Sequence, residues 1–118
     1  MNTDKTKLKN EKIRNHEFLK EMYDDSYFPD FLVDKGQDIL LDLCFQIEQS
    51  QVSSLEELYK LTHCATEKFN ELQAEFEDND SEIETAAREC IAMDFEFIAS
   101  SYGFTDADTE ELISSRDW

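Results

Sequence analysis

Glycine and proline are scarce in this chain, which has two Gly and one Pro in 118 residues. The tight turns of a β-sandwich or barrel depend on these residues, so their scarcity argues against a β-rich fold. The chain also lacks the run of about 20 apolar residues that a membrane-spanning helix requires. The composition therefore predicts an all-α protein with no membrane partner, built from a few long helices joined by short polar loops.

Cysteine is limited to Cys44, Cys64 and Cys90, without a Cys-x-x-Cys pair. An odd number of widely spaced cysteines does not fit a disulfide framework. The first twenty residues lack the apolar centre of a secretory signal. We therefore expect a cytoplasmic protein with reduced thiols, in which each cysteine is a small core residue.

Positive charge is the most pronounced shortage: 11 Lys and Arg stand against 29 Asp and Glu, for a formal net charge of −18. Six basic and three acidic side chains fall in residues 1–20, so the remaining 98 residues are more acidic still. Such a body repels nucleic acid and anionic membranes, and it attracts basic surfaces with fast, salt-dependent association. We expect a basic protein partner and no direct nucleic-acid binding. The alternative is that the charge only maintains solubility.

The chain length indicates one domain. Residues 1–10 are polar and rich in lysine, which predicts a flexible basic arm, and residues 11–118 are expected to form a single helical domain. The spacing of apolar residues predicts a compact bundle of four to five helices. The second of these is apolar nearly all round, so we expect it to be buried at the centre of the bundle.

Capping residues set the expected helix ends. A short amphipathic helix is predicted over 11–23, and the central helix over 29–49 with Pro29 in its first turn. Ser53 and Ser54 each begin a capping box for the third helix. The fourth helix is expected to start at Asp80 or Ser81 and to end at Gly103, and a short fifth helix to start at Thr105 or Asp106.

Motifs for catalysis and metal binding are missing. His63 and Cys64 are adjacent, so on a helix their side chains diverge by about 100° and cannot pair as nucleophile and base. Two glycines cannot build a phosphate-binding loop. The acidic window 78–89 resembles a calcium loop, but Ile83 stands where that loop needs glycine. We therefore expect a non-catalytic protein without cofactor or metal.

Asp94 is an unusual carboxylate, because it lies in the middle of the fourth helix's apolar stripe between Cys90 and Phe97. One interpretation is a buried acid with a raised pKa, or the floor of a groove, in a small enzyme or metal-binding module. The other is a structural acid paired with a neighbouring polar group or lying on a partly covered face.

A run of carboxylates in the third helix and the loop after it is the candidate partner-binding site. Like charges spaced by four residues destabilise a helix. A protein that keeps such a row at this cost is expected to use its electric field to attract a partner. A solvated helix face is the alternative. The segment 27–31 and Trp118 supply aromatic residues that either anchor a partner or close the ends of the core. The candidate partner-binding residues are Glu67, Glu71, Glu75, Glu77, Asp78, Asp80, Glu82 and Glu84.

Three stretches carry a resemblance to a known family: LKEMYDDSYFPDFLVDKGQDIL (19–40), ELQAEFEDNDSEIETAARECIA (71–92) and ADTEELISSRDW (107–118). They resemble a family of small acidic bacterial proteins classified only as a domain of unknown function. The similarity spans about residues 18–118. It implies a bacterial cytosolic protein and supplies no catalytic residue, cofactor or substrate.

The leading hypothesis is an acidic protein that binds and neutralises a basic partner. Its most concrete form is an immunity protein that occludes a toxin, by analogy of size and charge. One alternative is a nucleic-acid mimic that inhibits or regulates a DNA- or RNA-binding protein. The other is a small enzyme or metal-binding module that uses Asp94.

Overall fold

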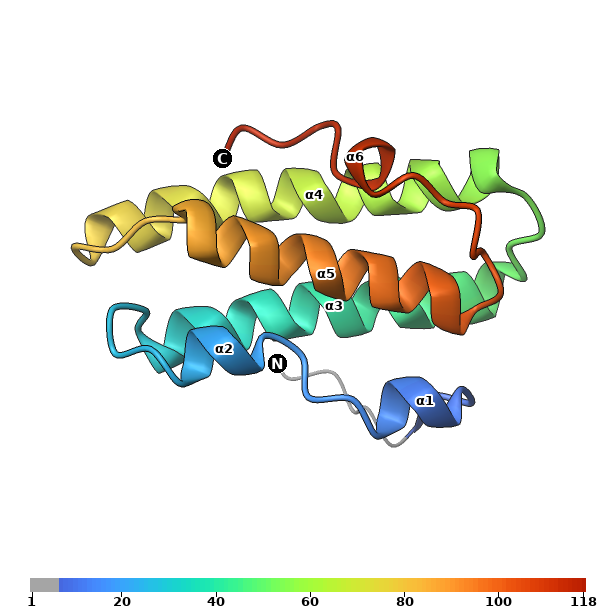
Figure 1. The fold of residues 1–118 in the computed structure, drawn as a ribbon, viewed down its shortest axis with the longest axis horizontal. Helices are drawn as coiled ribbons and strands as arrows, with labels where there is room; N and C mark the ends of the chain where they lie inside the picture. Colours follow the sequence, from blue (N-terminus) through green and yellow to red (C-terminus); the bar gives the residue numbers. More distant parts are fainter. Residues whose placement is uncertain (1–6) are drawn as a thin grey trace.

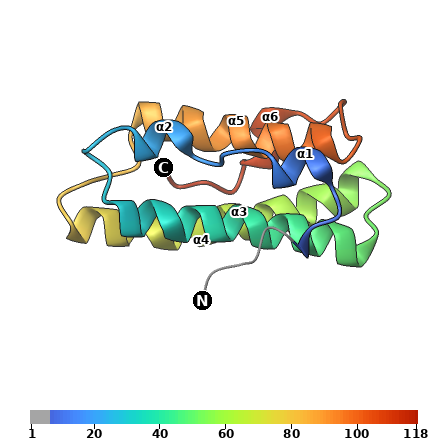
Figure 2. The same cartoon turned by 90° about the horizontal axis from the view of Figure 1, so that it is seen from below.

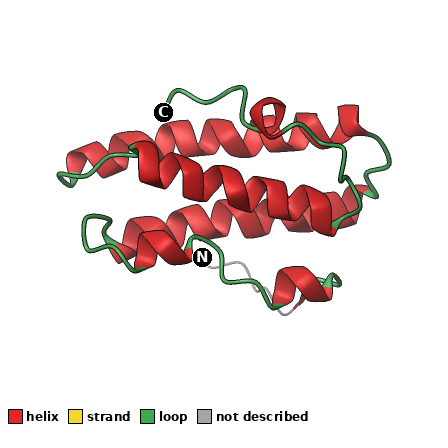
Figure 3. Ribbon diagram, in the orientation of Figure 1, coloured by secondary structure: helices red, strands yellow, loops and turns green. Residues whose placement is uncertain are grey.

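The computed structural model describes residues 7–118 of the protein. This part of the chain is helical and contains no strand (Figure 3), which confirms the all-α prediction. The helices are α1 (Glu11–Arg14), α2 (Lys20–Tyr23), α3 (Asp30–Ser50), α4 (Leu55–Asp78), α5 (Thr85–Ser101) and α6 (Thr109–Leu112). Within residues 7–118, none of these helices combines the length and apolar character needed to cross a membrane.

The helices form two layers. The long helices α3 and α4 run antiparallel as a hairpin, and α5 crosses over this hairpin (Figure 1). Figure 2 shows α1, α2 and α6 in the same layer as α5, on one side of the α3–α4 hairpin. Helix α3 contacts α2, α4 and α5, as expected for a central helix, but its first turn leaves the Phe31 side chain 54% exposed.

Two of the expected helix ends are confirmed. Ser54 caps α4, since its side-chain oxygen accepts the Glu57 N–H at 3.2 Å. Gly103 follows α5 with a φ of 91°, and the Phe104 N–H returns to the Ala99 carbonyl at 2.8 Å. A left-handed glycine after a helix turns the chain so that the N–H groups that follow can bond to the last carbonyls of the helix. This was the role predicted for Gly103.

The single helix expected over 11–23 is instead divided into α1 and α2, so residues 7–118 form six helices rather than four or five. The break covers residues 15–19 and ends at Leu19, whose φ of 59° is left-handed. The Leu19 N–H donates to the Asp94 carboxylate on α5 at 2.7 Å. A tertiary hydrogen bond therefore accompanies the break in a segment whose local pattern favours a helix.

The starts of the last two helices also differ from the expectation. Asp80 adopts a left-handed φ of 60°, and α5 begins only at Thr85 with Glu84 as its cap. The Glu84 carboxylate accepts the Ala87 N–H at 3.3 Å. Likewise, Asp108 rather than Thr105 or Asp106 caps α6.

The basic arm was expected over residues 1–10, of which 1–6 lie outside the described residues. Leu8 is 1% exposed. The N–H groups of Lys9 and Asn10 donate to the Glu48 carboxylate at 2.9 and 3.1 Å, and the Asn10 amide donates to the Ser101 carbonyl at 2.7 Å. Residues 8–10 are thus held against α3 and the end of α5.

The core contains Cys44 and Cys90, as expected, but Cys64 is exposed. Cys64 is one residue from buried Ala65 and lies on the outer side of α4, so its prediction as a core residue was wrong. Trp118 is only 7% exposed and packs on Phe69 with ring centroids 6.1 Å apart. Of the two roles considered for this tryptophan, the structure assigns it to closing the core.

Candidate functional site

The carboxylates of the predicted acidic run do not share one surface. Glu67, Glu71, Glu75 and Asp78 recur at three- and four-residue spacing and form one row along α4. This row lies opposite the buried positions of the helix, such as Phe69 and Phe76. The structure therefore brings four of the eight predicted residues together on the outer side of α4.

The other four members are directed elsewhere. Glu77 is two positions from Glu75 and accepts a hydrogen bond from the Gln73 amide at 3.2 Å, away from the row. The chain turns at Asp80, which is exposed. Glu82 is exposed and Glu84 caps α5, so these two carboxylates lie at the end of the bundle where α4 passes into α5 (Figure 1).

A second row of carboxylates lies on α3 beside the α4 row. Two ion pairs connect the rows across the hairpin: Lys35 of α3 with Glu75 of α4, and Lys68 of α4 with Asp42 of α3 at 3.4 Å. Because the α3 carboxylates are spaced by four, they share one side of that helix. We call the two rows together the acidic face: Asp34, Asp38, Asp42, Glu67, Glu71, Glu75 and Asp78.

One exposed aromatic side chain continues the acidic face, and a second lies near the loop between α4 and α5. Phe31 is 54% exposed and precedes Asp34 by three residues, so it continues the α3 row. Tyr27 is 45% exposed; burial and the charges of Glu82 and Glu84 raise the pKa of its hydroxyl. Of the three aromatic residues in the segment 27–31, Tyr27 and Phe31 are exposed and Phe28 is buried.

Asp94 forms a second candidate site, which the fold builds from distant parts of the chain. Its carboxylate is held from two sides: Oδ1 lies 2.8 Å from Nε2 of His16, and Oδ2 accepts the Leu19 N–H at 2.7 Å. The His16 ring stacks on Phe97 with centroids 4.0 Å apart, and its edge meets Phe18 at 4.7 Å. This geometry matches the interpretation of Asp94 as an acid paired with a neighbouring polar group.

The Asp94 carboxyl is more basic than an ordinary aspartate. Burial raises its pKa, and the hydrogen bonds from His16 and from the Leu19 N–H oppose that rise without cancelling it. Two adjoining hollows, of about 410 and 350 Å³, lie beside the pair. Both are lined by His16, Met93 and Asp94, so the pair forms part of the wall of a groove between residues 15–21 and α5.

The described residues contain no group of three His, Cys, Asp or Glu side chains placed to hold a metal ion. Cys90 lines the larger hollow four residues before Asp94 on α5, and burial raises the pKa of its thiol to about 11. A thiol of that pKa is protonated near neutral pH and is a poor nucleophile. The groove thus presents charged side chains and apolar contact surface to a ligand.

Two features of these sites were missed from the sequence. Asp34, Asp38 and Asp42 were not recognised as a row, because their helix was expected to be apolar nearly all round, although their spacing of four residues is that of Glu67, Glu71 and Glu75. His16 was not connected with Asp94, because 78 residues separate them and no local pattern joins them.

A family model described as a family of unknown function, DUF5713, matches residues 12–118. No curated protein and no solved structure matches the chain.

Proposed function

We propose that this chain, which belongs to the family of unknown function DUF5713, is a non-catalytic protein that binds and neutralises a basic protein partner. The acidic face is the observation that carries this proposal. It gathers carboxylates from two helices on one side of the hairpin, where a partner can contact both rows together.

The charge of the face supports a binding role. The seven carboxylates of the face and its two lysines, Lys35 and Lys68, together carry a formal charge of 2 − 7 = −5. Rows of like charge at four-residue spacing reduce helix stability, by about 0.2–0.5 kcal/mol for each pair. A partner with a basic surface removes this repulsion, and the long-range field speeds its approach.

The exposed aromatic side chains supply the contacts that charge alone does not. Aromatic residues that enter a pocket on the partner typically carry much of the binding energy, whereas exposed charges mainly set the association rate. Phe31 lies at the end of the α3 row, and Tyr27 lies close to Glu82 and Glu84. On this proposal the acidic face steers the partner, and the two rings hold it after contact.

The most concrete form of the proposal is a bacterial, cytoplasmic immunity protein whose acidic face covers the basic active site of a toxin. Its small size and net charge of −18 support this form by analogy. The mechanism is electrostatic steering followed by steric occlusion. Co-expression with the cognate toxin should then restore cell growth, and the protein should stop the toxin's activity at a one-to-one ratio.

The acidic face is tested by the variant Glu67→Lys/Glu71→Lys/Asp78→Lys. These three side chains are exposed. Glu75 is left unchanged because it pairs with Lys35, so its replacement would also place two lysines together. We expect the association rate with the partner to fall about tenfold or more at low salt, and the salt dependence to weaken.

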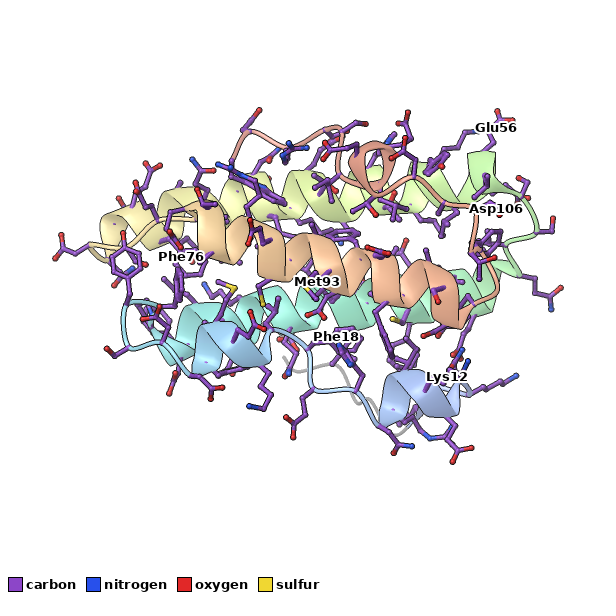
Figure 4. The ribbon with its side chains drawn as sticks, viewed as in Figure 1. Lys12, Phe18, Glu56, Phe76, Met93 and Asp106 are labelled. Atoms are coloured by element: carbon purple, nitrogen blue, oxygen red, sulfur yellow. The ribbon has the colours of Figure 1, made fainter. Side chains whose placement is uncertain are left out.

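A matched control carries the same change in net charge away from the acidic face. Glu56→Lys/Glu89→Lys/Asp106→Lys replaces three exposed carboxylates on α4, on α5 and in the loop after α5. Figure 4 shows Glu56 and Asp106 at the end of the bundle opposite the α4–α5 loop. If only the total charge matters, this control and the face variant will lose affinity equally.

The partner is identified by affinity capture from the source cell's lysate at low salt, with a salt gradient for elution and mass spectrometry of the eluate. The wild type, the face variant and the control are compared in parallel. A basic protein retained by the wild type and the control, but lost from the face variant, supports the proposal. Displacement of that protein by duplex DNA would instead indicate a nucleic-acid mimic. Equal retention by all three proteins contradicts the assignment of the acidic face.

A further inference from the structure

The groove beside Asp94 lies in the layer of α1, α2 and α5, whereas the acidic face belongs to the α3–α4 hairpin (Figure 2). Its two hollows share three lining residues and have volumes of about 410 and 350 Å³. Ligand sites for small molecules typically measure about 300–1,000 Å³. The groove is therefore large enough for a small organic molecule.

One wall of the groove is apolar and adaptable. The Met93 side chain is 62% exposed and presents an apolar surface to both hollows. Figure 4 shows Met93 on α5; Phe18, below it in this view, is buried and lines neither hollow. The Phe97 ring lines the second hollow beneath His16. A flexible thioether next to an aromatic ring is suited to contact the apolar body of a ligand.

The charges around the larger hollow favour a cation. Its lining includes the carboxylates of Glu17 and Glu21, both on exposed residues. The basic residues of this lining are His16 and Lys20. The Lys20 ammonium group pairs with the Asp24 carboxylate at 3.0 Å. The His16 imidazole and the Asp94 carboxylate lie against each other. Glu17 and Glu21 thus keep the rim negative, and an anionic ligand is disfavoured there.

We propose that this groove binds a small organic amine, in which a single ammonium group is carried on a short apolar chain or ring. The ammonium group lies between the Glu17 and Glu21 carboxylates, and the apolar body lies against Met93 and Phe97. This proposal does not depend on the proposed function, because it uses none of the residues of the acidic face.

The probe is phenethylamine, followed by mapping of backbone amide chemical shifts by NMR at near-physiological ionic strength. Two compounds of similar shape are the controls: the neutral phenethyl alcohol and the anionic phenylacetate. We expect phenethylamine to give saturable shifts at residues 15–21 and 90–97, the alcohol to bind at least about fivefold more weakly, and phenylacetate not to bind. A protein of this charge collects cations without specificity, but such shifts spread over the surface and do not saturate.

Variants separate the groove from the general charge of the protein. Glu17→Gln/Glu21→Gln removes two rim charges and should weaken phenethylamine binding about tenfold, since each exposed charge pair contributes modestly. Glu67→Gln/Glu71→Gln removes the same charge from the acidic face and should leave binding within about twofold of the wild type. The proposal is overturned by equal losses in both variants, by equal binding of the alcohol, or by shifts centred on α3 and α4.

Discussion

Replacing Asp94 by alanine removes the carboxylate that holds residues 16–19 against α5. The carboxylate makes two short polar contacts, at 2.8 Å to His16 and 2.7 Å to the Leu19 N–H, and the residue is only 7% exposed. A hydrogen bond to a charged group contributes about 1.5–3 kcal/mol, and a buried donor left without an acceptor costs about 1–3 kcal/mol. The His16 side chain is 26% exposed, so its contribution belongs near the lower end of that range. We expect Asp94→Ala to lower the free energy of unfolding by about 3 kcal/mol.

Asp94→Asn is the matched replacement. Its carbonyl oxygen still accepts the Leu19 N–H, and its amide nitrogen donates to a neutral His16 ring, so we expect a loss of about 1 kcal/mol or less. Urea unfolding of the three proteins near neutral pH, followed by circular dichroism, measures both differences. Combining His16→Ala with Asp94→Ala gives the coupling between the two side chains, which should be about 1–2 kcal/mol.

The pH dependence of Asp94→Asn tests the burial of the carboxyl group. The folded-state pKa of Asp94 lies above its ordinary value, so the folded protein binds the proton more tightly than the unfolded chain does. The proton-linked part of the stability that this group contributes is present in full below the ordinary pKa and is lost as pH rises through the folded pKa. The difference in unfolding free energy between wild type and Asp94→Asn should therefore decline with rising pH. An Asp94→Ala variant as stable as Asp94→Asn would refute this account of the pair.

Three further predictions concern the rest of the bundle. A Cβ at Gly36 would lie 2.9 Å from a Leu19 methyl carbon, so the steric cost of an added methyl group should exceed the gain in helix propensity. We therefore expect Gly36→Ala to lower the free energy of unfolding, measured in urea, by about 1 kcal/mol. A variant more stable than the wild type contradicts this prediction. Burial raises the pKa of Glu48, but hydrogen bonds from the Tyr102 hydroxyl and two backbone N–H groups lower it overall. Its contribution is thus lost as pH falls through the folded pKa, and the destabilisation by Glu48→Gln, about 1 kcal/mol near neutral pH, should disappear in acid. Finally, a thiol reagent should modify Cys64 within the folded protein and reach the two buried cysteines only after unfolding; rapid modification of all three would show that the core is open.

Local signals account for the parts of the fold that were predicted correctly. The α3 helix was expected over 29–49 and spans Asp30–Ser50. Ser54 and Gly103 mark helix ends by interactions within a few residues, so their roles follow from sequence spacing. The place of Asp94 in an apolar stripe made its burial one of the interpretations that the sequence left open, and the residue is 7% exposed. These features depend on neighbours along the chain, which the sequence displays directly.

The parts that were predicted incorrectly depend on partners far away in the sequence. The helix expected over 11–23 is interrupted at Leu19, whose N–H bonds to a carboxylate 75 residues later. Likewise, the acidic run was treated as one surface, although Glu77 lies off the α4 row and the Asp80 turn carries Glu82 and Glu84 to the end of the bundle.

By itself, the sequence determined the helical class, the large negative charge and the presence of one acid among apolar residues, because composition and periodicity are properties of the chain. Only the tertiary structure decided which charges lie together. Packing of α3 on α4 joined two rows of carboxylates into the acidic face, and packing of residues 16–19 on α5 supplied the partners of Asp94. Electrostatic and hydrogen-bond energies depend on distances of a few ångströms in space, and separation along the chain does not fix those distances.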